Sequence, residues 1–240
     1  MNKIKVELVL EPSSDPRELI GGLARLTQFK SEFKLVNKDR GEKVLKAIKA
    51  MGHTSLLEPV RFGFVISNAS RVFLAQITRH RQATYVSQSQ QYQDHSNFPF
   101  VVIPDLEKDK VLEGRYYDLM QQADELYRDL KAAGIPQDQA RYVIPGAARN
   151  DLFIETNARE LIEVIFPQRS CRRNTLETRV VIAKMYNALF EKGYDYLFDG
   201  VGPACLTVGV CDQGNMACGK PFTSKEELQL EAFERTSLCK

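Results

Sequence analysis

The densest group of chemically capable side chains is the Arg-His-Arg sequence at residues 79–81, followed by Ser87 and Ser89. Two arginines and a histidine in three successive residues cannot share one helix face. They must therefore spread around a helix end or point at an anion, since guanidinium groups bind phosphate through two donors. A solvated helix terminus with basic residues near the helix dipole would explain the same cluster. The residues alone leave both interpretations open.

Cysteines form a second group. Cys205, Cys211 and Cys218 are separated by loops that could wrap one metal ion, and Cys171 could supply a fourth ligand. Structural zinc takes four tetrahedral ligands, at about 2.3 Å for thiolates, and ties down segments that have little core of their own. The spacing lacks the tight C-x2-C pattern of zinc ribbons, so we expect either a structural zinc at these four residues or free thiols. Cys239 is expected to be exposed and incidental.

Several segments have the periodicity of elements that could position these groups. Polar and apolar residues alternate over 5–10 and 60–67, which predicts strands, and a short strand is expected over 151–156. Asp15 and Pro16 predict the start of a helix that runs to Leu26. Further helices are expected over 41–51, 71–81, 157–166 and 175–192, with a long one from about 112 that ends at Gly134.

Strands and helices mix without a regular βα alternation. This pattern favours an α+β fold, with a mixed sheet flanked by helices, over a doubly wound sheet. From Gly193 onward the chain is rich in glycine and cysteine and has no clear periodicity. We therefore expect one main domain over residues 1–200 and a cysteine-bearing C-terminal extension over 201–240.

The composition is that of an ordinary globular protein, with 43% hydrophobic and 27% charged residues among 240. No run reaches the roughly 18 apolar residues that a membrane helix needs, and the first residues do not resemble a signal peptide. We therefore expect a cytoplasmic protein without a membrane partner. The net charge of +2 gives no general attraction to nucleic acid, so any anion site must be local.

The surroundings of the Arg-His-Arg sequence resemble the flavin-dependent thymidylate synthases. Residues 79–89 match the RHRx7S signature of that family. Other segments resemble family segments in the same order: H-x-[ST]-x-x-E at 53–58, ARxxLP at 140–145, NxR at 157–159, R-x-C-x-R…E-x-R at 169–179, and the tail of cysteine-bearing members at 202–219. The likeness covers about residues 50 to 219, and agreement at so many ordered places is not expected by chance.

The resemblance implies a catalytic α+β domain that assembles as a homotetramer, with active sites built between subunits. It also implies FAD as cofactor, with NADPH and methylenetetrahydrofolate as co-substrates, for the reductive methylation of dUMP to dTMP. Flavin contacts are then expected from His53, Ser55, Glu58, Arg79, His80, Arg81, Asn157 and Arg159. Nucleotide contacts are expected from Gln76, Arg79, Ser87, Ser89, Gln90, Arg141 and Arg169.

Arg169 and Ser89 are the candidate catalytic residues. C5 of uracil is a poor nucleophile until negative charge accumulates on the ring, and Arg169 near the N3/O2 edge would stabilise that charge. Cationic groups near the flavin would stabilise its reduced anion and tune its potential. No thiol attack on C6 is then required, and residues 1–170 contain no cysteine.

The chain departs from the family pattern at several positions. Gln91 stands where the family usually has an arginine, and an amide keeps a donor but loses the charge and the two-pronged geometry. Glu163 stands where some members carry a flavin-facing asparagine. Pro167 and Gln168 place Arg169 one residue later than usual relative to the NxR segment.

These departures leave three interpretations open: drift within a divergent branch, a different pyrimidine nucleotide as substrate, or loss of activity. If dUMP is the substrate, another cation must replace the missing arginine. Arg172 and Arg173 are the nearest surplus cations in the sequence, and we expect one of them to turn inward.

A non-enzymatic nucleic-acid-binding protein is an alternative of another class. Its phosphate contacts would be Arg79, Arg81, Arg169, Arg172 and Arg173. The small net charge and the lack of a recognised nucleic-acid-binding motif argue against it. We expect nucleotide and folate substrates as partners, and no nucleic acid.

Overall fold

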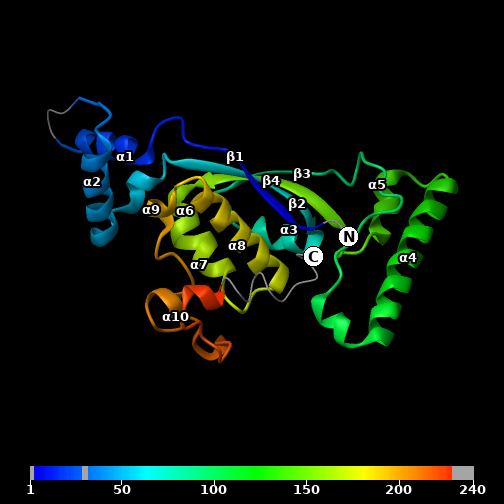
Figure 1. The fold of residues 1–240 in the computed structure, drawn as a ribbon. Helices are drawn as coiled ribbons and strands as arrows, with labels where there is room; N and C mark the ends of the chain where they lie inside the picture. The colour runs from blue at the N-terminus through cyan, green and yellow to red at the C-terminus, as the bar shows by residue number, and fades with distance from the viewer. Residues whose placement is uncertain (1–2, 29–31, 229–240) are drawn as a thin grey trace.

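The structure is a computed structural model that describes residues 3–28 and 32–228. A four-stranded sheet forms its centre (Figure 1), in the order β1-β2-β4-β3. The strands are β1 (Lys5–Leu10), β2 (Arg61–Ser70), β3 (Thr84–Ser87) and β4 (Arg149–Asn157). β4 lies between β2 and β3, and each neighbouring pair of strands is antiparallel. The α+β class is confirmed, but the sheet is antiparallel throughout where we expected a mixed one.

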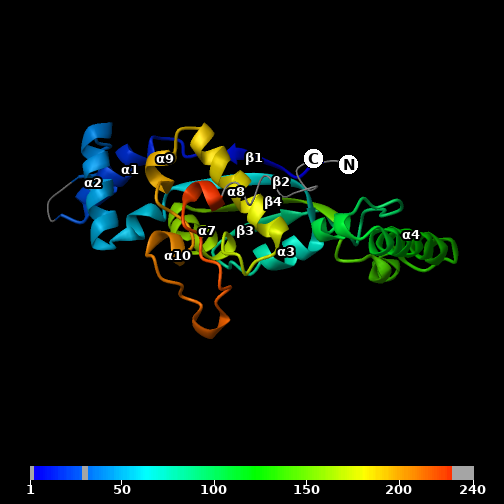
Figure 2. The same ribbon diagram turned by 60° about the horizontal axis from the view of Figure 1, so that its bottom comes forward.

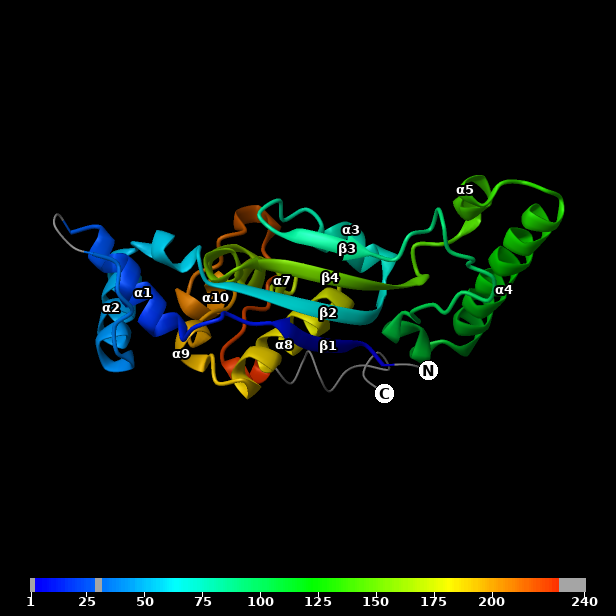
Figure 3. The same cartoon turned by 90° about the horizontal axis from the view of Figure 1, so that it is seen from above.

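Helices cover one face of this sheet, and the opposite face carries no helix in the part of the chain that the structure describes (Figures 1 and 3). The largest of the covering helices is α8 (Leu176–Glu191), which brings Val181 and Met185 against the strands. Phe62, Phe64 and Ile66 of β2 are fully buried, because alternate side chains of a strand point to one face. This core fixes the strands from which the candidate site is built.

Two helical units extend the molecule at its ends (Figure 1). α1 (Pro16–Leu26) packs on α2 (Lys38–Met51) at one end, and Gly41 allows their close approach, since a Cβ there would lie 2.1 Å from the Arg17 carbonyl oxygen. At the other end, α4 (Lys110–Ala132) projects from the sheet, as Figure 2 also shows, and α5 (Gln137–Ala140) lies beside it. Among the described residues, no helix has the length and apolar character needed to cross a bilayer.

Most predicted elements are confirmed with small shifts at their ends. α1 has Asp15 as its cap and Pro16 in its first turn, as expected. α2 begins three residues before the expected Gly41, because the side chain of Asn37 caps it by accepting a hydrogen bond from the Arg40 N–H at 2.9 Å. The strand β3 was not predicted.

The largest difference concerns the helix predicted over 71–81. The observed α3 (Arg71–Ile77) ends four residues earlier. The Thr78 N–H still donates to the Leu74 carbonyl, but the His80 N–H donates to the Ile77 carbonyl at 3.2 Å, which turns the chain toward β3. The Arg-His-Arg sequence therefore lies in a turn and not on a helix.

A continuous helical segment covers residues 158–169. It consists of α6 (Ala158–Glu160), the π-helical turn η4 (Leu161–Ile165) and α7 (Phe166–Arg169). The Phe166 N–H donates to the Leu161 carbonyl, five residues back, so the turn holds one more residue than an α-helical turn. Pro167 therefore does not end the helix as we expected.

Short elements complete the fold. They are η1 (Thr54–Leu57), η2 (Pro104–Lys108), η3 (Arg141–Val143), α9 (Asp195–Phe198), α10 (Ala204–Thr207) and η5 (Gly214–Met216). Leu197 and Phe198 of α9 are fully buried in the main core, whereas residues 207–217 are all exposed. The boundary at residue 200 remains a prediction, and Cys239 lies outside the described residues.

Candidate active site

The turn between α3 and β3 spreads the Arg-His-Arg side chains in different directions, as the sequence predicted. The hydroxyl of Tyr85 closes this turn by donating to the carbonyls of Ile77 at 2.6 Å and His80 at 2.9 Å. His80 points inward and is 5% exposed, while Arg79 and Arg81 are exposed. One imidazole is thus held inside the protein and two cations remain at the surface.

The carboxyl end of the 158–169 segment brings Arg169 to this turn. Its Nε–H donates to Nε2 of His80 at 2.8 Å. Its terminal nitrogens donate to the side chain of Gln76 at 3.2 Å, to the backbone carbonyl of Gln76 at 3.0 Å and to the side chain of Asn174 at 3.3 Å. Gln76, His80 and Arg169, predicted separately, therefore come together from three elements.

The four acceptors around Arg169 are all uncharged. Because Nε2 of His80 accepts a hydrogen bond, the ring proton belongs on Nδ1, which lies 3.4 Å from a carboxylate oxygen of Glu160. Burial, and then the charge of Arg169, lower the pKa of His80 from 6.5 to about 4. His80 is therefore neutral at pH 7, and these contacts leave the positive charge of Arg169 uncompensated.

Glu177 on α8 fixes the start of α3. Its carboxylate accepts hydrogen bonds from the backbone N–H and the hydroxyl of Ser70, the N-cap residue of α3. The Ser70 hydroxyl in turn accepts from the Phe73 N–H at 3.0 Å. Glu177 is 8% exposed, and burial raises its pKa. Because Gln76 lies on α3, Glu177 is a positioning residue for the site.

A second cluster lies at the amino end of the 158–169 segment. One terminal nitrogen of Arg159 lies 2.6 Å from Glu58, and its Nε lies 2.9 Å from Glu163. Asn157 caps this segment by accepting a hydrogen bond from the Glu160 N–H at 2.8 Å. Since Glu160 also faces His80, the helical segment connects the two clusters.

His53 and Ser55 lie beside this second cluster, on the chain that leads into β2. Gly52 ends α2 in the left-handed conformation, with φ of 72°, and the His53 N–H donates to the Ile48 carbonyl at 2.8 Å. The chain then forms η1, on which His53, Ser55 and Glu58 are exposed. Five of the predicted flavin contacts are thereby gathered near one end of the sheet.

Other predicted residues lie apart from Arg169. The Ser89 hydroxyl, beyond β3, accepts hydrogen bonds from the N–H groups of Gln91 at 3.1 Å and Tyr92 at 3.3 Å, which shapes a turn. Ser87 and Gln90 flank it. Arg141 ends α5, and α5 lies beside α4 at the end of the molecule away from α7 (Figures 1 and 3). One chain does not bring Arg141 to Arg169.

A polar cavity of about 500 Å³ adjoins Ser89 and is also lined by His95 and Arg149. We did not predict His95 as a site residue. Its Nε2 is buried and has no hydrogen-bond partner within the described residues. Glu160, Asn174 and Glu177 were also missed. Only Glu177 had a sequence signal, since it is part of the R-x-C-x-R…E-x-R match.

We expected either Arg172 or Arg173 to turn inward toward the nucleotide residues. Arg172 does not. Its guanidinium lies 2.5 Å from the Glu227 carboxylate and 3.9 Å from the centre of the Phe222 ring. Arg172 thus binds the C-terminal extension, whereas Arg173 is exposed.

The predicted zinc site is not assembled in the structure. Within residues 3–28 and 32–228, no three His, Cys, Asp or Glu side chains are grouped closely enough to hold a metal ion. Cys171, Cys205, Cys211 and Cys218 nevertheless line one cavity.

Comparison with known proteins identifies the family. The family model described as thymidylate synthase complementing protein matches residues 8–192. The flavin-dependent thymidylate synthase of Geobacter sulfurreducens is 37% identical over 178 residues, which cover 73% of this chain and 75% of that protein. The chain belongs to the flavin-dependent thymidylate synthase family. The enzyme of the same name from Clostridium tetani is 30% identical, with 93% of this chain and 96% of that protein covered.

Membership in the flavin-dependent thymidylate synthase family confirms the resemblance predicted from the Arg-His-Arg sequence and places the chain among enzymes. A solved structure shares its fold. The UMP/dUMP methylase PolB from Streptomyces cacaoi, bound with 5-Br dUMP, aligns with a TM-score of 0.66 over 80% of this chain and 91% of that chain. At 18% identity, this similarity speaks for the fold alone.

Proposed function

We propose that this member of the flavin-dependent thymidylate synthase family carries out the reductive methylation of dUMP to dTMP, with FAD as cofactor, methylenetetrahydrofolate as carbon donor and NADPH as reductant. The observation that carries the proposal is the guanidinium of Arg169, oriented by His80, Gln76 and Asn174 without a neutralising carboxylate among these contacts. A fixed, uncompensated cation is suited to the negative charge that must build up on a uracil ring before C5 attacks. Removal of one such oriented donor typically slows a reaction about 100- to 1,000-fold.

The chemistry of the second cluster fits a flavin dinucleotide. The half-buried guanidinium of Arg159, together with the exposed guanidinium groups of Arg79 and Arg81 in the Arg-His-Arg turn, supplies charge-assisted donors for a pyrophosphate. His53 and Ser55 add polar groups beside them. When bound, the flavin supplies the reducing equivalents for the methylation. The role of these residues is to bind and orient it, while neutral His80 holds the plane of the Arg169 guanidinium.

A homotetramer would complete the site. Arg141 and Ser89 lie apart from Arg169 within one chain, so a second copy would bring them to the nucleotide. Leu112, Leu119 and Leu126 of α4 recur every seven residues and are 47–57% exposed, which is typical of a helix that packs against another subunit. Light scattering of the purified protein should give about four times the chain mass of 27.3 kDa.

A different pyrimidine nucleotide is the second candidate substrate. Two observations favour it: Gln91 replaces an expected cation, and Arg172 is engaged with the extension and so cannot replace that charge. A nucleotide phosphate or base would then meet an amide at this position. The reaction type and the role of Arg169 would be unchanged.

Flavin reoxidation tests the proposed reaction. The enzyme-bound FAD is reduced with NADPH without oxygen and is then mixed with dUMP, with methylenetetrahydrofolate, or with both. We expect the oxidised flavin absorbance to return quickly only when both are present. If dUMP does not affect the rate of reoxidation but another pyrimidine nucleotide increases it, that nucleotide is the better candidate substrate. If the protein does not bind flavin, or if NADPH does not reduce the flavin, both proposed reactions are wrong.

A further inference from the structure

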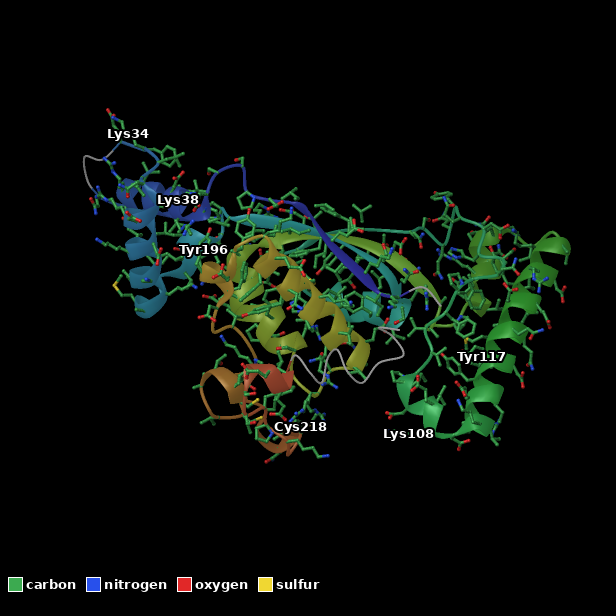
Figure 4. The ribbon with its side chains drawn as sticks, in the orientation of Figure 1. Lys34, Lys38, Lys108, Tyr117, Tyr196 and Cys218 are labelled. Carbon is green, nitrogen blue, oxygen red and sulfur yellow. The ribbon has the colours of Figure 1, made fainter. Side chains whose placement is uncertain are left out.

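Four cysteines from two distant parts of the chain line one cavity of about 200 Å³. Cys171 lies in the turn between α7 and α8, Cys205 lies on α10, and Cys211 and Cys218 follow in the extension. All four are free thiols. Figure 4 shows Cys218 on the extension, below the helices that cover the sheet.

The cavity lies where the extension is already attached to the α7–α8 turn. Arg172, next to Cys171, donates to the carbonyls of Lys220 and Pro221 and lies over the ring of Phe222, which is 4% exposed. The segment after Cys218 is therefore held against the residue after Cys171. These contacts hold Cys171 and Cys218 on neighbouring segments without any bond between their sulfur atoms.

Two of the thiols accept hydrogen bonds from nearby backbone N–H groups. The Lys220 N–H donates to Sγ of Cys218 at 3.4 Å, and the Arg173 N–H donates to Sγ of Cys171. In both cases the donor lies two residues after the cysteine, and the Cys218 thiol also donates to the Lys220 carbonyl at 3.4 Å. Gly219, with φ of 71°, gives the backbone the left-handed turn that this geometry uses after Cys218.

The four sulfur atoms are close enough to influence each other electrostatically. Burial raises the pKa of the Cys171 thiol, and the nearby Cys218, Cys205 and Cys211 raise it further, because neighbouring thiolates repel. Four thiolates held around one point would repel one another, so a bound cation is needed to compensate their charge. A zinc ion supplies that charge and deprotonates the thiols that coordinate it.

The loop that carries Cys211 lacks the packing that would otherwise hold it. Residues 207–217 are exposed, and Val208, Val210 and Met216 are 60–75% exposed. A segment that buries so little apolar surface gains little from the hydrophobic effect. Metal binding provides folding free energy in such cases.

We propose that Cys171, Cys205, Cys211 and Cys218 form a tetrahedral zinc site that fastens the C-terminal extension to the α7–α8 turn. Because no three ligand side chains are yet at metal-binding separation in the described residues, the site closes when the exposed 207–217 loop moves its thiol toward Cys171. Two disulfides would also fasten the extension. The four cysteines are free thiols in the structure, which favours zinc over disulfides.

Metal content tests this site independently of the proposed reaction. Protein purified in reducing buffer without chelator should contain about one zinc per chain, as a closed four-thiolate site requires. Cys211→Ser and Cys218→Ser should each lose most of it. Cys239→Ser is the matched control, because this cysteine is outside the proposed set, and it should keep the metal.

A second experiment avoids variants that fail to fold. The natural protein is stripped with a chelator and refilled with Zn²⁺ or Co²⁺. We expect the midpoint of thermal unfolding to fall on removal and recover with Zn²⁺, and the Co²⁺ form to show intense sulfur-to-cobalt absorption of a tetrahedral thiolate site. Absence of metal, an unchanged midpoint, a Co²⁺ spectrum without sulfur bands, or a mass two hydrogens lower per cysteine pair would each overturn the zinc site.

Discussion

The Nε–H of Arg169 donates to Nε2 of His80 across 2.8 Å, and this contact sets the state of both groups. The imidazole must be neutral to accept the hydrogen bond, and the guanidinium keeps its full charge in return. Glu160 on the other side of His80 lies 3.4 Å from Nδ1. The candidate catalytic cation is therefore oriented by a residue that stays neutral at pH 7, because burial lowers the pKa of His80 to about 4.

We predict that acid weakens the folded state through His80. The unfolded chain takes up a proton near pH 6.5, whereas the folded chain does so only near pH 4, so the unfolded state binds more protons between these values. The stabilising contribution is present above pH 6.5 and is lost as pH falls toward 4. Between pH 7.5 and pH 5 the free energy of unfolding should drop by about 2 kcal/mol from this group.

His80→Asn is the comparison for this prediction. Asparagine can still accept from Arg169 but does not titrate. Denaturant unfolding at both pH values should show a smaller pH dependence in the variant than in the natural protein. An equal dependence in both proteins would mean that His80 is not held neutral.

Arg169→Lys should lower kcat/KM for the nucleotide by about 10- to 100-fold. Lysine keeps a charge but loses the planar group that contacts His80 and Gln76 together, so the cation is no longer fixed. Arg173→Lys, an exposed arginine four residues later, is the matched control and should stay within about two-fold of the natural rate. Steady-state kinetics of both variants measure this difference. An equal loss of kcat/KM in both would show that Arg169 does not have a catalytic role.

Glu163→Gln should increase the retention of flavin by a few-fold. The carboxylates of Glu58 and Glu163 both pair with Arg159, so a flavin phosphate must compete with them for this guanidinium. Loss of one carboxylate frees a donor. The control is Glu113→Gln, which removes a carboxylate paired with the exposed Lys110 on α4. Equilibrium dialysis with FAD measures the change, and weaker binding in Glu163→Gln would show that the glutamate itself contacts the cofactor.

Gln91→Arg tests the substrate. If dUMP is bound, an added charge-assisted contact should tighten it by up to about ten-fold or leave it unchanged. Arg172→Ala should leave dUMP binding unchanged, because Arg172 pairs with Glu227 of the extension. Loss of activity in Gln91→Arg, together with weak dUMP binding by the natural protein, would favour a nucleotide that needs the neutral amide.

Much of the fold followed from local signals. Asp15 with Pro16 and the glycines after the long helices marked helix ends, and alternation marked β1 and β2, because these features depend on a few neighbouring residues. The strand β3 was missed because it is only four residues long and mostly exposed, and it forms only by pairing with β4. The antiparallel order likewise depends on where β4 inserts.

The candidate site was predictable only in part. The matched motifs named Gln76, His80 and Arg169, but their contact spans 93 positions of the chain and leaves no periodic trace in the sequence. The π turn at Leu161–Ile165 was not predicted either, because only the folded chain shows that the Phe166 N–H donates to the carbonyl five residues back. Glu160 and Asn174 could not be predicted, because their contacts with His80 and Arg169 depend on how the folded chain places them.

The most direct test of the account is the product formed from isotopically labelled methylenetetrahydrofolate. The protein with bound flavin, NADPH, labelled folate and dUMP is incubated without oxygen, and the nucleotides are analysed by mass spectrometry. We predict dTMP that carries the folate label, at a rate reduced by the Arg169→Lys variant and not by Arg173→Lys. Unlabelled dUMP recovered intact, under conditions in which the flavin is bound and reduced, would contradict thymidylate synthesis by this chain.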